Sequence, residues 1–134
     1  MSYETEPLSV ESLPSTTNLT DATAGTTVFQ FRNFDIEFRN HSYIAPVVSP
    51  RLYLHSDGLW YLGYRLVNCQ WQGLLSLTAR FFAGTEQLHE ESNVDFLLKC
   101  HIAVYGAGGT IPERFFNRVN RVNLEFATVS VRVC

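Results

Sequence analysis

The sequence predicts an all-β fold, an antiparallel β-sandwich of about seven to eight strands. Three observations carry this prediction. Apolar and polar residues alternate over most of the chain, which is the period of a half-buried strand. Turn-forming residues interrupt the alternation at regular intervals. The only good helix candidate is a short segment near 110–120, where an irregular crossover is the alternative. The length of 134 residues fits one domain.

The first segment of the chain differs in composition from the rest. Residues 1–26 hold four acidic residues and no Lys or Arg, are rich in Ser and Thr, and lack periodic apolar residues. Such a segment buries too little apolar surface to offset the loss of chain entropy on ordering. We therefore expect residues 1–26 to be a disordered acidic tail and residues 27–134 to form the sandwich.

The first strand region, residues 28–38, alternates in two phases. Phe29 and Phe31 share one parity, whereas Phe34 and Ile36 share the other, so a bulge or turn is expected near Asn33. Two prolines and an Asn-His-Ser cluster then predict a connection over residues 39–50.

A hairpin is expected over residues 51–66, because Ser56, Asp57 and Gly58 form a tight-turn signal between two alternating runs. The later elements follow from the same pattern: strands over 74–82, 95–105 and 128–133, a polar acidic loop over 84–93, a strand break at the glycine run 106–109, and a short helix start with a capping box at Thr110 and Glu113.

The cysteines predict thiols rather than a disulfide framework. Cys69, Cys100 and Cys134 are odd in number and form no Cys-x-x-Cys pair, whereas a zinc site needs four clustered ligands and a disulfide framework an even count. We expect two half-buried thiols on strands and one thiol at the terminus, in an intracellular, cytoplasmic protein. The acidic start and the absence of a long apolar run predict neither a secretory signal nor a membrane partner.

Composition and motifs exclude several function classes. The net charge of −3 supplies no phosphate-neutralising surface, so nucleic acid is not expected as a partner. The four histidines lack metal-ligand spacing, no Gly-x-Ser-x-Gly elbow is present, and the glycine run lacks the lysine of a phosphate loop. We expect no enzymatic activity, no metal and no cofactor.

Aromatic residues and arginine carry the functional signal. Aromatic residues make up 13% of the chain, and arginine supplies nine of the ten basic residues. Tyr, Trp and Arg are enriched in contact hot spots, and arginine suits planar hydrogen-bonded recognition. The candidate partner-binding residues are Tyr61, Arg65, Trp71, Lys99, His101 and Phe116.

Several segments share a pattern with a known family. The sequence FQFRNF at 29–34, SPRLYL at 49–54 and GLWYL at 58–62 resembles the opening of a MATH (meprin and TRAF homology) domain, also called TRAF-C-like. LLSL at 74–77 and the strand at 96–106 resemble later strands of that family. The segment before the last strand is shorter than in the family, so the family's peptide groove transfers only in part.

The resemblance implies an eight-stranded antiparallel sandwich that docks a short peptide or a partner domain, as an adaptor does. The partner would lie across a sheet face or pair with an edge strand. The sequence therefore predicts a non-enzymatic protein–protein interaction module.

Two alternatives remain open. Trp71 beside Asn68, Gln70 and Gln72 resembles a sugar platform, which would suit a carbohydrate-binding or small-ligand-binding sandwich. The valine-rich last strand would suit a self-assembling structural protein, a homo-oligomer, if that strand is an unprotected edge.

Overall fold

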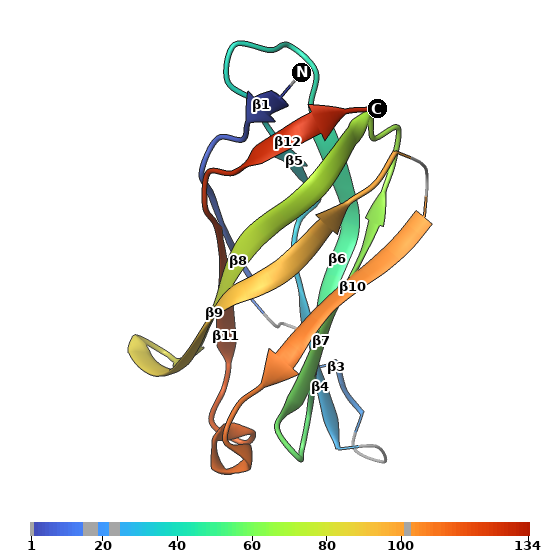
Figure 1. Ribbon diagram of the computed structural model, residues 1–134. Helices are drawn as coiled ribbons and strands as arrows, with labels where there is room; N and C mark the ends of the chain where they lie inside the picture. The colour runs from blue at the N-terminus through green and yellow to red at the C-terminus, as the bar shows by residue number, and fades with distance from the viewer. Residues whose placement is uncertain (1, 15–18, 22–24, 101–102) are drawn as a thin grey trace.

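The computed structural model describes residues 2–14, 19–21, 25–100 and 103–134. Strands dominate these residues, and the one helical element among them is a single 3-10 turn, η1 (Glu113–Phe115). Two antiparallel sheets pack face to face (Figure 1). The predicted β-sandwich is confirmed. A 3-10 turn stands where a short helix or an irregular crossover was expected.

The first sheet is built around one long strand, β8. Its order is β1-β12-β8-β11-β2, and β9 pairs with the other side of β8. β11 and β12 both pair with the same side of β8, so together they form one interrupted strand. On their outer side, β2 pairs with β11 and β1 pairs with β12, so β1 and β2 form a second interrupted strand. The members are β1 (Ser2–Glu4), β2 (Leu8–Glu11), β8 (Trp71–Ala83), β9 (Glu86–Leu98), β11 (Arg121–Phe126) and β12 (Ser130–Val133).

The second sheet has the order β10-β7-β6-β4-β3, with β5 also paired to β6. The break between β4 and β5 spans Asn33, where the change of phase predicts it. The members are β3 (Leu19–Asp21), β4 (Thr26–Gln30), β5 (Phe34–Ile36), β6 (Ala45–His55), β7 (Leu59–Leu66) and β10 (Ala103–Thr110).

The N-terminal segment belongs to the sandwich. The prediction of a disordered tail is wrong for residues 2–14 and 19–21, because β1 pairs with β12, β2 with β11 and β3 with β4. Tyr3, Leu8 and Val10 pack against the core. Only one face of β1 and of β2 packs against the core, so the segment needs few apolar side chains. For this reason its composition resembles that of a disordered segment although it is ordered. Gly25 and Thr26 are also ordered, because β4 already begins at Thr26. The rest of the predicted tail, residues 1, 15–18 and 22–24, lies outside the described residues.

Four further predictions about segments of the chain are also wrong. β6 begins at Ala45, inside the predicted connection, and β9 fills the predicted acidic loop as the second strand of a hairpin with β8. The predicted strand over 95–105 is two strands, and β10 runs through the glycine run that was expected to break it. Cross-strand pairing decides these positions rather than local propensity.

The core lies between the sheets and is rich in aromatic side chains. The ring of Tyr64 stacks on Phe96 with 3.9 Å between centroids, and Phe126 meets Phe96 edge to face. The Tyr64 hydroxyl donates to the Leu97 carbonyl (3.0 Å) and accepts from the Leu97 N–H (2.9 Å), so it binds the backbone of β9 from the opposite sheet. Burial raises the pKa of this hydroxyl, against the smaller lowering effect of the hydrogen bond to Leu97.

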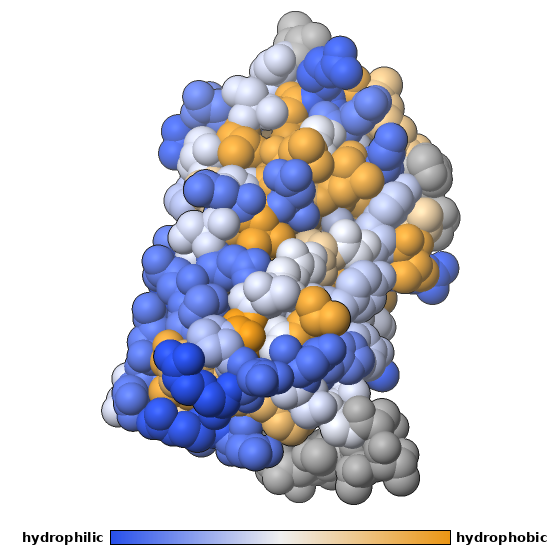
Figure 2. Space-filling view, turned by 60° about the horizontal axis from the view of Figure 1, so that its bottom comes forward, coloured by the Kyte–Doolittle hydropathy of each residue, from blue (hydrophilic) through white to orange (hydrophobic). Residues whose placement is uncertain are grey.

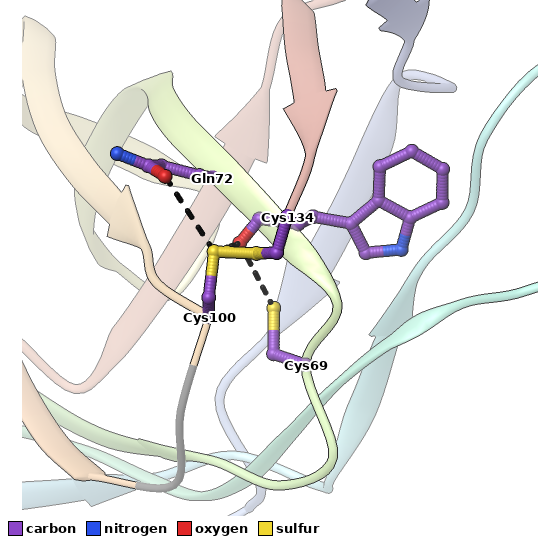
Figure 3. The surroundings of a disulfide bond; sticks show 5 residues. Cys69, Gln72, Cys100 and Cys134 are labelled. Carbon is purple, nitrogen blue, oxygen red and sulfur yellow. Dashed lines mark hydrogen bonds between the residues drawn. A yellow bond between two sulfur atoms is a disulfide. The ribbon is translucent and has the colours of Figure 1, made fainter. Parts of the chain in front are cut away.

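A disulfide joins Cys100 and Cys134, with 5.8 Å between their Cα atoms (Figure 3). The prediction of free thiols is therefore wrong for these two residues and holds for the buried Cys69. The physical reason is register, because the ends of β9 and β12 flank the same first residues of β8. The cysteine argument for an intracellular location no longer holds. No helix in the described part of the chain has the length and hydropathy needed to span a membrane.

Candidate functional site

The candidate site lies on the outer face of the second sheet. There β6, β7 and β10 run side by side (Figure 1), and their outward side chains line a shallow hollow of about 340 Å³. We call it the arginine–tyrosine hollow. Its principal residues are Val48, Arg51, Tyr53, Tyr61, Arg65 and Val104. Two of the six predicted residues, Tyr61 and Arg65, are among them.

Strand register arranges the hollow in three rows across β6, β7 and β10. Arg65 lies between Val48 and Val104 in the first row. Tyr61 lies beside Tyr53 in the third, with 6.4 Å between ring centroids. The middle row is Arg51, Gly63 and Gly106, so its centre has no side chain.

The glycines make the floor of the hollow. A Cβ on Gly106 would overlap the ring of Tyr61, and a Cβ on Gly63 would lie 3.3 Å from the same ring. The Tyr61 ring therefore lies over bare backbone, as glycine inside a strand permits. Tyr61 is nevertheless 45% exposed, so much of the side chain remains accessible to another molecule.

A bulge in β6 shapes one wall. The pairing with β7 shifts between Val48 and Arg51, and Ser49 has a positive φ of 52°. The Ser49 N–H donates to Asn33 Oδ1 at 2.8 Å, which holds the bulge from the neighbouring segment. Bulges re-aim side chains beside binding sites.

The hollow is positively charged. Its lining contains Arg51 and Arg65 but neither Asp nor Glu. Among the residues that the structure describes, no carboxylate forms an ion pair with either arginine, whereas Arg39, Arg80 and Arg118 are each paired with glutamate. These two guanidinium groups are available to an anionic partner.

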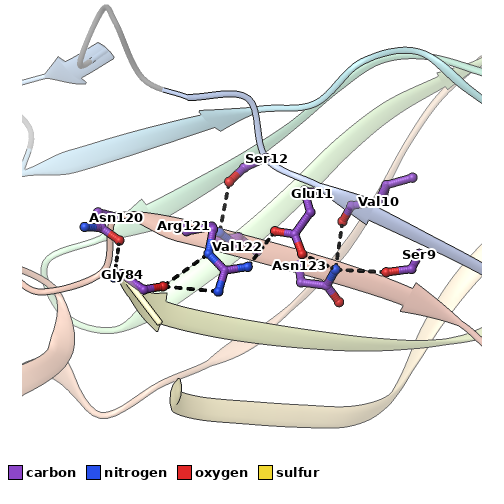
Figure 4. A network of polar contacts seen from close by, with 9 residues as sticks. All are labelled: Ser9, Val10, Glu11, Ser12, Gly84, Asn120, Arg121, Val122 and Asn123. Carbon is purple, nitrogen blue, oxygen red and sulfur yellow. Dashed lines mark hydrogen bonds and ion pairs between the residues drawn. The ribbon is translucent and has the colours of Figure 1, made fainter. Parts of the chain in front are cut away.

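On the outer face of the first sheet, in contrast, Arg121 and Asn123 are hydrogen-bonded to neighbouring polar groups (Figure 4). Arg121 donates to Glu11 at 2.8 Å and stacks on the Phe82 ring. Asn123 is buried, and its Nδ2 lies within hydrogen-bond distance of Ser9 Oγ, Glu11 Oε1 and the Val10 carbonyl.

Arg80 lies on this same face and donates to Glu90 and Glu125, at 2.7 Å each. The hydrogen bond that Arg80 donates to Glu125 raises the pKa of the Arg80 guanidinium most, and the one that it donates to Glu90 raises it further. The polar groups of Arg80, Arg121 and Asn123 are therefore satisfied within the molecule.

Trp71 is not a surface residue. It is 1% exposed, stacks on Phe38 with 3.7 Å between centroids, and meets Tyr3 and His41 edge to face. Its predicted place in a polar connection is wrong because β8 already begins at this residue and turns the ring inward. The carbohydrate-binding alternative needs an exposed Trp71, so the burial of this ring removes the basis for that alternative.

Lys99 lies on the other side of the molecule. It lines a shallow surface on the first sheet with Leu74, Leu97 and Arg132, so it does not join the arginine–tyrosine hollow. Phe116 is half-buried and packs against the core just after η1. The end of the molecule that carries η1 is mainly hydrophilic in Figure 2, and the apolar surface gathers farther up. His101 lies outside the described residues.

Each lateral edge of the sandwich carries a hydrogen bond that joins the two sheets. Glu91 Oε1 accepts from Trp60 Nε1 (3.3 Å) and from the Thr110 N–H (2.8 Å), which ties β9 to β10 and β7. On the other side, the Leu13 N–H donates to the Gln30 carbonyl. The last strand, β12, lies between β1 and β8, so it is not the unprotected edge that self-assembly required.

Within the described ranges, no three His, Cys, Asp or Glu side chains form a group that could hold a metal ion. The chain matches no protein-family model, no curated protein and no solved structure.

Proposed function

We propose that the protein is a non-catalytic protein–protein interaction module that holds an acidic peptide segment of a partner in the arginine–tyrosine hollow. One observation carries the proposal. Arg51 and Arg65, without a carboxylate partner among the described residues, lie beside the exposed Tyr61 and the half-buried Tyr53 on a face whose middle row holds glycine. Arginine and tyrosine at the centre of a contact are the residue types that dominate binding free energy.

The geometry suggests how such a segment binds. An extended peptide crosses β6, β7 and β10, and one apolar side chain enters the hollow beside Tyr53 and Tyr61. Carboxylates on either side of that residue accept paired hydrogen bonds from Arg51 and Arg65, which present planar guanidinium donors. The aromatic contact supplies most of the affinity, and the arginines select for negative charge.

Docking on a face is favoured over addition of a strand at an edge. Tyr64 occupies the backbone of β9 at Leu97, and Glu91 occupies the N–H of Thr110. A partner strand would have to displace these groups before it could pair. The hollow needs no such displacement.

The resemblance to MATH domains supports the same proposal. Counting each interrupted pair as one strand, and β4 with β5 as another, leaves eight principal strands and the short β3. Eight strands are what the resemblance implies. An adaptor role, in which this domain selects a peptide motif, follows from that resemblance.

An array of immobilised peptides tests the proposal. One set carries a central apolar residue flanked by Asp or Glu, and the matched set carries Lys at the same positions. We expect the full chain to bind the acidic set, and Arg51→Gln with Arg65→Gln to weaken binding at least about tenfold. Arg132→Gln makes a matched control, because Arg132 is exposed on the opposite sheet. Equal binding of both sets, or equal effects of the variants, would contradict the proposal.

A further inference from the structure

Three sulfur atoms gather near one end of β8. Cys69 Sγ lies 3.5 Å from the Trp71 carbonyl oxygen, and Cys100 Sγ lies 4.0 Å from that same oxygen. The Cys100 sulfur is bonded to Cys134. Figure 3 shows the free thiol and the disulfide on the two sides of this carbonyl. A third cysteine therefore sits beside an existing disulfide.

The fold brings the three cysteines together from separate segments. Cys69 lies in the connection between β7 and β8, Cys100 follows the end of β9, and Cys134 follows β12. Gly73 pairs with Leu98, and Gln72 pairs with Arg132, so the ends of β9 and β12 meet at the start of β8. Strand register, rather than an accident of side-chain rotation, sets this proximity.

We propose that Cys69, Cys100 and Cys134 form one thiol–disulfide exchange centre, in which Cys100 pairs with either Cys134 or Cys69. Its co-reactant is a low-molecular-weight thiol. The centre is separate from the arginine–tyrosine hollow and does not depend on the function proposed for it.

The exchange is balanced in atoms and electrons. The thiolate of the small thiol attacks Cys100 Sγ and breaks the bond to Cys134, which leaves Cys134 as a thiolate and Cys100 in a mixed disulfide. The Cys69 sulfur, once deprotonated, attacks Cys100 Sγ, forms the Cys69–Cys100 bond and releases the small thiol as its thiolate. One disulfide is broken and one is formed, and the proton of Cys69 passes through solvent to Cys134.

The surroundings of Cys69 explain why an external thiol starts the exchange. Burial raises the pKa of the Cys69 thiol, against the smaller effect of its hydrogen bond to the Trp71 carbonyl. The buried thiol therefore stays protonated and does not attack the intact disulfide. After the Cys100–Cys134 bond opens, only the hydrogen bond from the Cys134 N–H to the Gln70 carbonyl fastens this residue beside Cys69 in the described part of the chain, and we expect its movement to expose Cys69 to solvent.

The exchange removes the disulfide that holds the end of β12 to the end of β9. β12 pairs with β8 at only Arg132 and Val133, and it carries β1 on its other side. Tyr3 of β1 packs edge to face on Trp71. Release of Cys134 loosens this cover, so the emission of Trp71 reports the exchange.

Peptide mapping of a Cys134→Ser variant tests the proposal. Trypsin separates the three cysteines into peptides 66–80, 100–114 and 133–134. After incubation with reduced and oxidised glutathione and trapping with iodoacetamide, we expect 66–80 linked to 100–114 as the main species. A folded Cys134→Ser protein, checked by circular dichroism, that keeps Cys69 free would overturn the proposal.

The full-length wild-type chain gives a second measurement if that variant does not fold. With catalytic glutathione we expect two linked species to coexist, 100–114 with 133–134 and 100–114 with 66–80. A Cys69→Ser control should show only the first. Detection of only the first species in the wild type, over the whole range of glutathione ratios, would also overturn the proposal.

Discussion

The two outer faces of the sandwich both carry arginine, but they use it differently. On the first sheet, Arg80 and Arg121 are held by Glu11, Glu90 and Glu125. On the second sheet, the arginines at the centre of the face have no carboxylate partner among the described residues, and glycine rather than a polar side chain lies between them.

This difference in arginine pairing indicates that the first face stabilises the fold, whereas the second face is able to bind a partner. A guanidinium group that already donates to two carboxylates has little left to offer another molecule, so the face of the first sheet stabilises the fold. A guanidinium beside an exposed ring, with no carboxylate beside it, keeps its donors for a partner. Substitutions on the first face should therefore change unfolding, and substitutions on the second should change binding.

The largest effect is expected at Asn123, at the centre of the paired face. Asn123→Ala leaves Ser9, Glu11 and the Val10 carbonyl without their amide partner at a buried position. We expect the free energy of unfolding to fall by about 2–3 kcal/mol. Urea denaturation measures it. A loss below about 0.5 kcal/mol, the range of an ordinary surface substitution, would show that the network is not structural.

Tyr61 should give the next largest effect, on binding rather than on unfolding. Tyr61→Ala removes an exposed ring from the hollow, and we expect peptide binding to weaken by about 2 kcal/mol, roughly thirtyfold. Tyr61→Phe keeps the ring and serves as the matched control. Fluorescence anisotropy with the best acidic peptide measures binding. If Tyr61→Ala instead destabilises the chain as much as Asn123→Ala does, the comparison between the faces fails.

Gly106 tests whether the position of the Tyr61 ring over the glycine backbone is required for peptide binding. A Cβ at Gly106 overlaps the Tyr61 ring, which is the movable end of a partly exposed side chain. We expect Gly106→Ala to displace the ring and weaken peptide binding about tenfold, while stability changes by less than about 1 kcal/mol. Gly84→Ala is a distant control for binding alone, since a Cβ there meets nothing within 4 Å but strains a turn residue with a φ of 62°. Unchanged binding would mean that a bare floor is not required.

Part of the hollow was predictable from sequence, because part of it is local. The turn at 56–58 and the alternation beyond it predict a hairpin with Tyr61 and Arg65 outward, and this hairpin is β6 with β7. The same turn places Tyr53 opposite Tyr61, because a tight turn at 56–58 fixes the register of the strands on either side of it.

The rest depended on pairing between distant segments. Val104 is 72% exposed beside Arg65 because β10 pairs with β7. The alternation over 95–105 instead predicts that Val104 faces inward, on a single strand with Phe96. The alternation over 95–105 predicts that Lys99 faces outward, but parity does not say on which of the two sheets it lies. The disulfide followed the same rule, since the register of β12 on β8 brings Cys134 to Cys100.

The smallest expected effects are the changes in stability when a paired arginine, Arg80, or one without an ion pair among the described residues, Arg65, is substituted. Arg80→Gln removes both ion pairs of a partly buried guanidinium, and we expect a loss of about 1 kcal/mol of stability. Arg65→Gln removes no ion pair within the described chain, so its stability should stay within about 0.3 kcal/mol of wild type. Parallel urea titrations in low and high salt measure both, and salt should narrow the gap because it screens the pairs of Arg80. Equal losses for the two variants would mean that Arg65 is engaged inside the fold, and the reason for assigning it to a partner would be gone.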